Sequence, residues 1–74
     1  MASVEVTLLY ADGRKAIVEP GLVISYEMSN GVRVRMLVTR VDPDEPRIMG
    51  TALGTTLTDG CRTNQVVGVE KKRG

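Results

Sequence analysis

The 74-residue sequence contains no histidine, no tryptophan and no phenylalanine, and it has a single cysteine, Cys61. Without histidine, the Ser-His and Cys-His pairs that activate a nucleophile are excluded. A zinc site would need several ligands from Cys61 and scattered acidic residues, which matches no common zinc ligand set. We therefore expect a protein that is not an enzyme and that binds no metal and no cofactor.

The sequence also lacks the features that direct a chain to a membrane or to an oxidising compartment. One cysteine cannot form an intrachain disulfide, which suits a reducing compartment. No apolar run approaches the ~18 residues of a membrane-spanning helix. The start MASVEV has no basic region followed by an apolar stretch, so no signal peptide is visible. These absences predict a cytoplasmic protein with no membrane partner.

Length and composition predict a single domain over residues 1–70, followed by a basic tail over residues 71–74. The chain is 42% hydrophobic and 26% charged, which argues against disorder. A chain this short buries only about 60% of the surface that its unfolded form exposes, so we expect a thin core and a homo-oligomer. The net charge of +1 neither requires nor excludes a nucleic-acid partner.

The apolar residues recur at the spacing of strands, and no segment keeps the spacing of a helix. Alternation predicts strands over residues 3–10, 15–19, 22–28, 32–41, 47–53 and 61–70. Residues 42–46, DPDEP, must form a loop because two prolines and three acids cannot sustain a ladder. Residues 54–60 are predicted as a loop or a weak hairpin. We expect an all-β fold: a small, five- or six-stranded antiparallel SH3-like barrel or curled meander with little or no helix.

The turn at Asn30-Gly31 allows the register of one hairpin to be predicted. A three-residue loop pairs Met28 with Val32 and keeps the apolar stripes of the two strands on one face. It requires Gly31 to adopt the left-handed conformation. The same reasoning applied to the loop at residues 11–13 predicts Leu8 opposite Ala16 and, two residues further, Val6 opposite Val18.

Several apolar side chains are left on the outer face by these registers. Val23 and Leu37 fall directly opposite each other there. Such a set is either a self-association surface or a scatter of surface aliphatics. The residues are Leu9, Ile17, Val23, Leu37 and Val41.

Arg33 and Arg35 lie two residues apart on one strand, so they project from the same face. A guanidinium binds oxyanions through two parallel hydrogen bonds, which favours a phosphate or carboxylate site. The alternative is a cross-strand ion pair of Arg33 with Glu27, while Ser25 lies opposite Arg35.

The segment DGCRTNQ offers further polar groups before the last strand. Arg62, Asn64 and Gln65 can recognise an anionic or amide-bearing ligand, or they are ordinary loop residues. Arg62 beside Cys61 could lower the pKa of the thiol. With no base in the sequence, a structural thiol is the favoured interpretation.

Residues 22–69 resemble the core of a WYL domain. The shared pattern is an Ile-x-Tyr strand, a glycine hairpin, a basic strand and an Arg-Thr pair before the last strand: Ile24, Tyr26, Gly31, Arg35, Arg62 and Thr63. The triad that names the family is absent, because residues 47–49 are Arg-Ile-Met. The resemblance implies a small SH3-like barrel that binds a ligand, in that family a nucleotide or nucleic acid.

These observations predict a non-enzymatic binding module for a phosphate-bearing ligand, a nucleotide or nucleic acid. Its ligand-binding residues would be Arg33, Arg35, Arg62, Asn64 and Gln65. The alternative is a small structural or inhibitory protein of a phage or mobile element. That protein would act through self-association or by binding a host protein.

Overall fold

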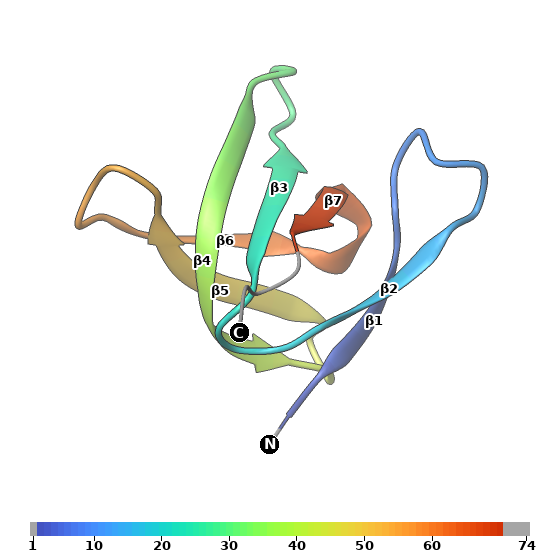
Figure 1. The fold of residues 1–74 in the computed structure, drawn as a ribbon, viewed down its shortest axis with the longest axis horizontal. Helices are drawn as coiled ribbons and strands as arrows, with labels where there is room; N and C mark the ends of the chain where they lie inside the picture. The colour runs from blue at the N-terminus through green and yellow to red at the C-terminus, as the bar shows by residue number, and fades with distance from the viewer. Residues whose placement is uncertain (1, 71–74) are drawn as a thin grey trace.

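The computed structural model describes residues 2–70, which form two antiparallel sheets (Figure 1). One sheet contains β1 and β2, and the other has the strand order β6-β5-β4-β3-β7. This confirms the all-β prediction, and the predicted tail at residues 71–74 lies outside the described residues. The elements are β1 (Val4–Thr7), β2 (Lys15–Val18), β3 (Val23–Glu27), β4 (Arg33–Asp42), β5 (Arg47–Ala52), β6 (Thr58–Arg62), the 3-10 helix η1 (Thr63–Gln65) and β7 (Val66–Glu70).

The larger sheet is a curled meander. Strands β3, β4 and β5 each pair with the next strand in the sequence, and β7 returns to pair with β3. Strands β6 and β7 are therefore the two edges of the sheet, yet only the three residues of η1 connect them. So short a connection requires the sheet to curl until its edges approach each other. The described residues contain seven strands instead of five or six, because the segment predicted as one closing strand is divided by η1.

The predicted register of the β3–β4 hairpin is confirmed. Tyr26 lies opposite Val34, and Ser25 lies opposite Arg35. The Met28 amide donates to the Val32 carbonyl oxygen over 2.8 Å, which closes the three-residue loop. Gly31 has a φ of +87°, the left-handed conformation that this loop requires.

The predicted register of the β1–β2 hairpin is wrong by two residues. Val6 lies opposite Ala16 instead of Val18, so the same side chains still face the core. The reason is a longer connection in which Tyr10 and Asp12 adopt positive φ angles of 60° and 52°. The chain leaves the hairpin early because the Leu9 amide donates to the Val66 carbonyl oxygen of β7 over 2.9 Å.

The prediction that Val41 lies on the outer face is wrong, because β4 contains a β-bulge. The register shifts between Val38 and Arg40, so alternation restarts and Val41 points inward. Val41 is only 5% exposed and belongs to the core, not to the outer face where we expected it. Gly50 lies opposite Val38 at this bulge, and a Cβ there would lie 2.0 Å from the Leu37 carbonyl oxygen. The two strands therefore approach closely only because residue 50 has no side chain.

The core lies between the two sheets and contains side chains from both. Tyr10 closes the strand predicted over residues 3–10, but in the structure it lies in the loop after β1 and is 76% exposed. In residues 2–70 no helix has the length and apolar character to cross a membrane. The buried apolar residues are Val4, Val6, Val18, Ile24, Tyr26, Met36, Val38, Val41, Ile48, Cys61 and Val66.

Candidate anion-binding face

Arg33 is held by an aromatic ring and not by the carboxylate predicted for it. Glu27 lies opposite Arg33 in the ladder, but its Oε2 accepts a hydrogen bond of 2.7 Å from the Tyr10 hydroxyl. The Arg33 Cζ lies 5.8 Å from the centroid of the Tyr10 ring, within the range of a cation–π contact. The hydrogen bond to Glu27 raises the pKa of the exposed Tyr10 hydroxyl. The Tyr10 side chain therefore contacts both Glu27 and Arg33 over the β3–β4 ladder.

Arg35 already has an internal carboxylate partner. Its Nε donates to Glu70 Oε2 over 3.0 Å, and its Nη2 donates to Glu70 Oε1 over 2.8 Å. Both side chains are half exposed, so this two-point ion pair contributes at most about 1 kcal/mol to stability. It nevertheless occupies the fork of the guanidinium that a ligand phosphate would use.

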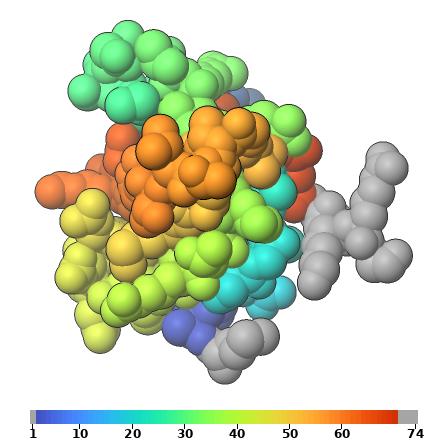
Figure 2. Space-filling view, turned by 90° about the vertical axis from the view of Figure 1, so that its left-hand side faces the viewer, coloured from blue at the N-terminus to red at the C-terminus, as the bar shows by residue number. Residues whose placement is uncertain are grey.

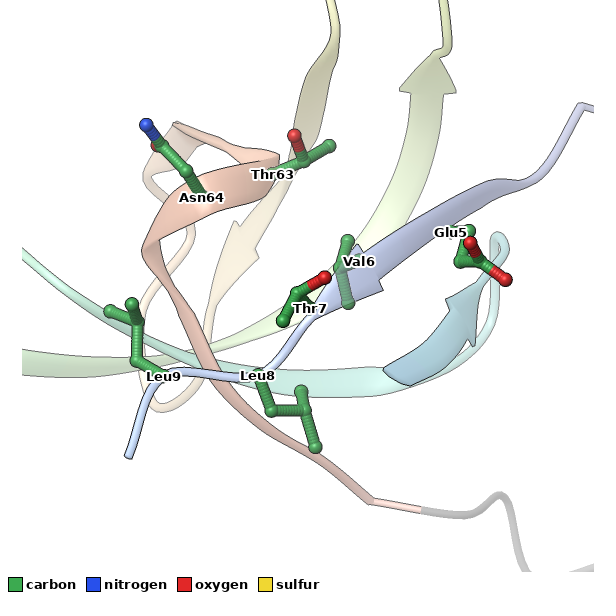
Figure 3. A pocket seen from close by; sticks show the side chains of 7 residues that line it. All are labelled: Glu5, Val6, Thr7, Leu8, Leu9, Thr63 and Asn64. Atoms are coloured by element: carbon green, nitrogen blue, oxygen red, sulfur yellow. The ribbon is translucent and has the colours of Figure 1, made fainter. Parts of the chain in front are cut away.

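The Gln65 side chain stabilises the connection between β6 and β7 through two hydrogen bonds. Its Oε1 accepts a hydrogen bond of 2.8 Å from the Arg62 amide, and its Nε2 donates to the Glu27 carbonyl oxygen over 3.1 Å. Both the oxygen and the nitrogen of the side-chain amide therefore already have main-chain hydrogen-bond partners. Asn64 is exposed and lies on η1, at the border of a hollow beside β1 (Figure 3).

Arg62 is not a ladder partner of Arg33 or Arg35. Arg62 lies opposite Arg47, the first residue of β5. Arg35 lies near the other end of β5, because its neighbour Met36 is paired with Ala52, the last residue of that strand. Within the described part of the chain, no hydrogen bond or ion pair connects Arg62 with Arg33 or Arg35. Among the described residues, Gln65 joins the Arg62 amide to the Glu27 carbonyl oxygen, whereas Arg35 is paired with Glu70, so no hydrogen bond or ion pair gathers all five predicted ligand-binding residues.

Arg62 belongs instead to a second group of basic side chains, which we call the arginine face: Arg40, Arg47 and Arg62. Arg47 and Arg62 are direct cross-strand partners, and their neighbours Ile48 and Cys61 point into the core, so both arginines point outward. Arg40 lies opposite Met49, which makes it the diagonal neighbour of Arg47 at a typical distance of ~7–8 Å. Strands β4 to β6, lime green to orange, form much of the surface in Figure 2.

The arginine face forms no ion pair within the described residues. Asp42 lies opposite Arg47, but Asp42 Oδ1 accepts a hydrogen bond of 3.0 Å from the Asp44 amide in the following turn. The Arg47 Nη2 lies 3.7 Å from the position that a Cβ of Gly60 would occupy. The Arg47 guanidinium therefore lies over β6 beside Gly60, at an ordinary contact distance.

The sequence did not identify Arg40 and Arg47 as site residues. The signal that reveals them is the pairing of β5 with β6, which places Arg47 and Arg62 together. The sequence did not reveal that pairing, because residues 54–60 are rich in glycine and threonine and were predicted as a loop or a weak hairpin. In the structure β6 already begins at Thr58.

The surroundings of Cys61 favour the interpretation of a structural thiol. It is 3% exposed, and burial, together with the nearby charge of Asp59, raises the pKa of the thiol to about 11. Arg47, not Arg62, is the cation that partly opposes this shift. Asp59 also accepts a hydrogen bond from the Tyr26 hydroxyl, and burial and this bond raise the pKa of Tyr26. Residues 2–70 contain no cluster of three acidic or cysteine side chains able to hold a metal ion.

A hollow of about 340 Å³ lies between β1 and η1 (Figure 3). Its lining contains one ionisable side chain, Glu5, and it contains no member of the arginine face. The lining residues are Glu5, Val6, Thr7, Leu8, Leu9, Thr63 and Asn64.

Comparisons with protein-family models, with curated proteins and with solved structures find no match for this chain. The resemblance of residues 22–69 to a WYL domain therefore stays a prediction. The features that remain for assigning a function are the arginine face and the hollow beside β1.

Proposed function

We propose that this protein is a non-enzymatic binding module that recognises a phosphate-bearing ligand, a nucleotide or nucleic acid, through the arginine face. The observation that supports this most directly is the cross-strand pair of Arg47 and Arg62. Like charges placed directly opposite each other destabilise a sheet. A bound phosphate would offset this repulsion, because each guanidinium can donate two hydrogen bonds to its oxygens.

The structure supports different residues for this role than the sequence did. Arg62 remains in the proposed site, and Arg40 and Arg47 join it. Arg33 and Arg35 have internal partners, the Tyr10 ring and Glu70, so they contribute less to binding. Asn64 and Gln65 are left out because they lie on η1, where Gln65 is hydrogen-bonded at both ends.

The proposal is tested with a fluorescein-labelled DNA duplex and with labelled ATP, followed by fluorescence anisotropy. The double variant Arg47→Gln/Arg62→Gln should weaken binding at least ~10-fold, since each charge-assisted hydrogen bond contributes about 1.5–3 kcal/mol. The control is Arg33→Gln/Arg35→Gln, which removes the same charge elsewhere. Its affinity should stay close to that of the unmodified protein.

The salt dependence supplies a second measurement. If the duplex contacts the three arginines through phosphates, log K should fall with log salt with a slope of about −3. Equal losses of affinity in the two double variants would show that only net charge matters. The absence of binding to both probes at low salt would remove the proposal.

A second candidate function is self-association, or the binding of a host protein, by a small structural or inhibitory protein of a phage or mobile element. It is favoured by Val23 and Leu37, which pair on the outer face as predicted. Leu37 is 39% exposed and Ile17 is 53% exposed, while Leu9 and Val23 are partly buried. Burial of such side chains between two copies would stabilise a homo-oligomer.

Light scattering tests this second candidate. Leu37→Asp should convert an oligomer to a monomer, and the oligomer of the unmodified protein should survive high salt. Val32→Asp, at the far end of the β3–β4 hairpin, introduces the same charge at an exposed apolar position and serves as the control. A monomeric mass for the unmodified protein at high concentration would exclude the self-association form of this function.

A further inference from the structure

The outer edge of β2 has no neighbouring strand. Strand β2 pairs only with β1, and no other described element lies alongside it. In an antiparallel pair, successive residues point their amide and carbonyl groups alternately toward and away from the partner strand. The Leu8 amide donates to the Arg14 carbonyl oxygen over 2.8 Å, so the even-numbered residues of β2 point toward β1. The main-chain groups of Lys15 and Ile17 therefore point outward.

These outward groups have no partner among residues 2–70, because neither Lys15 nor Ile17 forms a main-chain hydrogen bond outside the β1–β2 ladder. The same alternation directs the Glu19 amide outward, while the Glu19 carbonyl oxygen accepts from the Leu22 amide over 3.3 Å. Pro20 follows and has no amide, so it ends the edge. The edge available for pairing therefore runs from Lys15 to Glu19, about 13 Å at the rise of a strand.

The edges of β6 and β1 are less available to another strand. On β6, the Gly60 amide donates to Asp59 Oδ1 and the Arg62 amide donates to Gln65 Oε1, each over 2.8 Å. On the other side of the small sheet, η1 lies next to β1. An additional strand would therefore pair most readily with β2.

The side chains along the β2 edge have a self-complementary order. Ala16 and Val18 face the core, so Lys15, Ile17 and Glu19 project from the outer face. Ile17 is 53% exposed. The edge thus has a cation at one end, an exposed apolar side chain at its centre and an anion at the other end. A second copy running in the opposite direction presents the matching order.

We propose that the β2 edge pairs in antiparallel orientation with the β2 edge of a second copy of this chain, about a twofold axis at Ile17. This register uses the whole edge of both copies. It places Ile17 opposite Ile17 of the second copy and Lys15 opposite Glu19 of the second copy. Both edges are consumed, so assembly stops at the dimer.

The charges select this register over the alternatives. A slip of two residues would place Lys15 opposite Ile17, and a parallel arrangement would bring like charges together. The contact of Lys15 with Glu5 is 3.8 Å long and both side chains are more than half exposed, so Lys15 can reach a second carboxylate. The dimer is one form of the self-association proposed as the second candidate function, so it rests on that function and not on phosphate binding.

Two charge-reversed variants test the register. Lys15→Glu and Glu19→Lys should each raise the dissociation constant of the dimer at least ~10-fold, because each places like charges opposite each other. An equimolar mixture of the two variants should form a heterodimer, because every opposing pair then has opposite charges. Sedimentation equilibrium at low salt, up to ~1 mM protein, measures the masses. The dimer should weaken as salt rises, whereas association through Leu37 should survive high salt.

Ile17→Pro tests the main-chain pairing. The Ile17 amide points away from β1, so proline removes a donor at the twofold axis and leaves the β1–β2 ladder intact. The dissociation constant should again rise at least ~10-fold. Ile17→Val keeps the amide and should dimerise nearly as well as the unmodified protein. In that protein, hydrogen exchange at the Ile17 amide should slow as the concentration rises. If Ile17→Pro does not fold, the mixed charge-reversed variants supply the test.

Three results would overturn the proposal. The first is a monomeric mass for the unmodified protein at ~1 mM and low salt. The second is a dimer that neither charge reversal weakens, or one that mixing the two variants does not restore. The third is a dimer that survives Ile17→Pro but is lost in Leu37→Asp, which would assign self-association to the Leu37 surface. Arg47→Gln/Arg62→Gln should dimerise like the unmodified protein, so loss of phosphate binding is a separate outcome.

Discussion

Arg47 on β5 and Arg62 on β6 are direct partners in an antiparallel ladder, and neither forms an ion pair within residues 2–70. Arg35 on β4, in contrast, forms a two-point ion pair with Glu70. The chain thus contains exposed arginines in two electrostatic settings. We expect the first setting to oppose folding and the second to support it.

Replacement of Arg62 by glutamine should stabilise the fold, because it removes a repulsion between cross-strand partners. We expect a gain of about 0.2–1 kcal/mol in the free energy of unfolding at low salt. Arg35→Gln should lower the free energy of unfolding by a similar amount, because it breaks the pair with Glu70. Chemical denaturation of both variants at low and high salt measures the effects, which should shrink together as salt screens them. Destabilisation by Arg62→Gln would mean that this arginine has a stabilising contact.

Gly50→Ala should strongly destabilise the protein. The new Cβ would lie 2.0 Å from the Leu37 carbonyl oxygen and 2.8 Å from its carbon, so β4 and β5 must separate. We expect a loss of roughly 1–3 kcal/mol, the range for forced overpacking. Gly68→Ala is the matched control, because no atom lies within 4 Å of its Cβ position and its φ is not positive. Thermal unfolding compares them, and equal midpoints for the two variants would contradict the close approach at residue 50.

The β3–β4 hairpin was predictable from sequence because a one-residue slip would bring its apolar stripe against its arginines. The β1–β2 register was not, because it depends on the bond from Leu9 to Val66, which joins distant parts of the chain. The burial of Val41 depends on a bulge that the sequence does not mark.

In the candidate site, too, features set within one strand were predictable from the sequence, and contacts between distant segments were not. The same-face placement of Arg33 and Arg35 follows from alternation along one strand, but their partners Tyr10 and Glu70 come from remote segments. The pairing of Arg47 with Arg62 likewise requires the register of two strands separated by a loop.

Tyr26→Phe should cost more stability than Tyr10→Phe, although each removes one hydroxyl that donates to a carboxylate. Tyr26 is 2% exposed and its partner Asp59 is partly buried, so the carboxylate would lose a bond that water cannot fully replace. We expect a loss of about 1–3 kcal/mol for Tyr26→Phe. Tyr10 is 76% exposed, and water can replace its bond to Glu27. Denaturation at neutral pH compares the two variants, and a larger loss for Tyr10→Phe would reverse the expected order.

The stability of the protein should fall at alkaline pH as the buried Cys61 thiol is forced to ionise. Burial raises its pKa from 9.0 to about 11, so the folded state holds the thiol proton more tightly than the unfolded chain does. This contribution is fully present below pH 9 and is lost as the pH rises toward 11, by up to ~3 kcal/mol.

Cys61→Ala isolates the contribution of the thiol. The variant lacks the titrating group but retains Tyr26, whose raised pKa also lowers stability at high pH. The difference in the free energy of unfolding between the unmodified protein and Cys61→Ala should be constant up to about pH 8 and then decrease through pH 9 to 11. Urea denaturation at a series of pH values provides this difference. A difference that grows with pH would require a stabilised thiolate, which would support a nucleophilic role for Cys61 and contradict its assignment as a structural thiol.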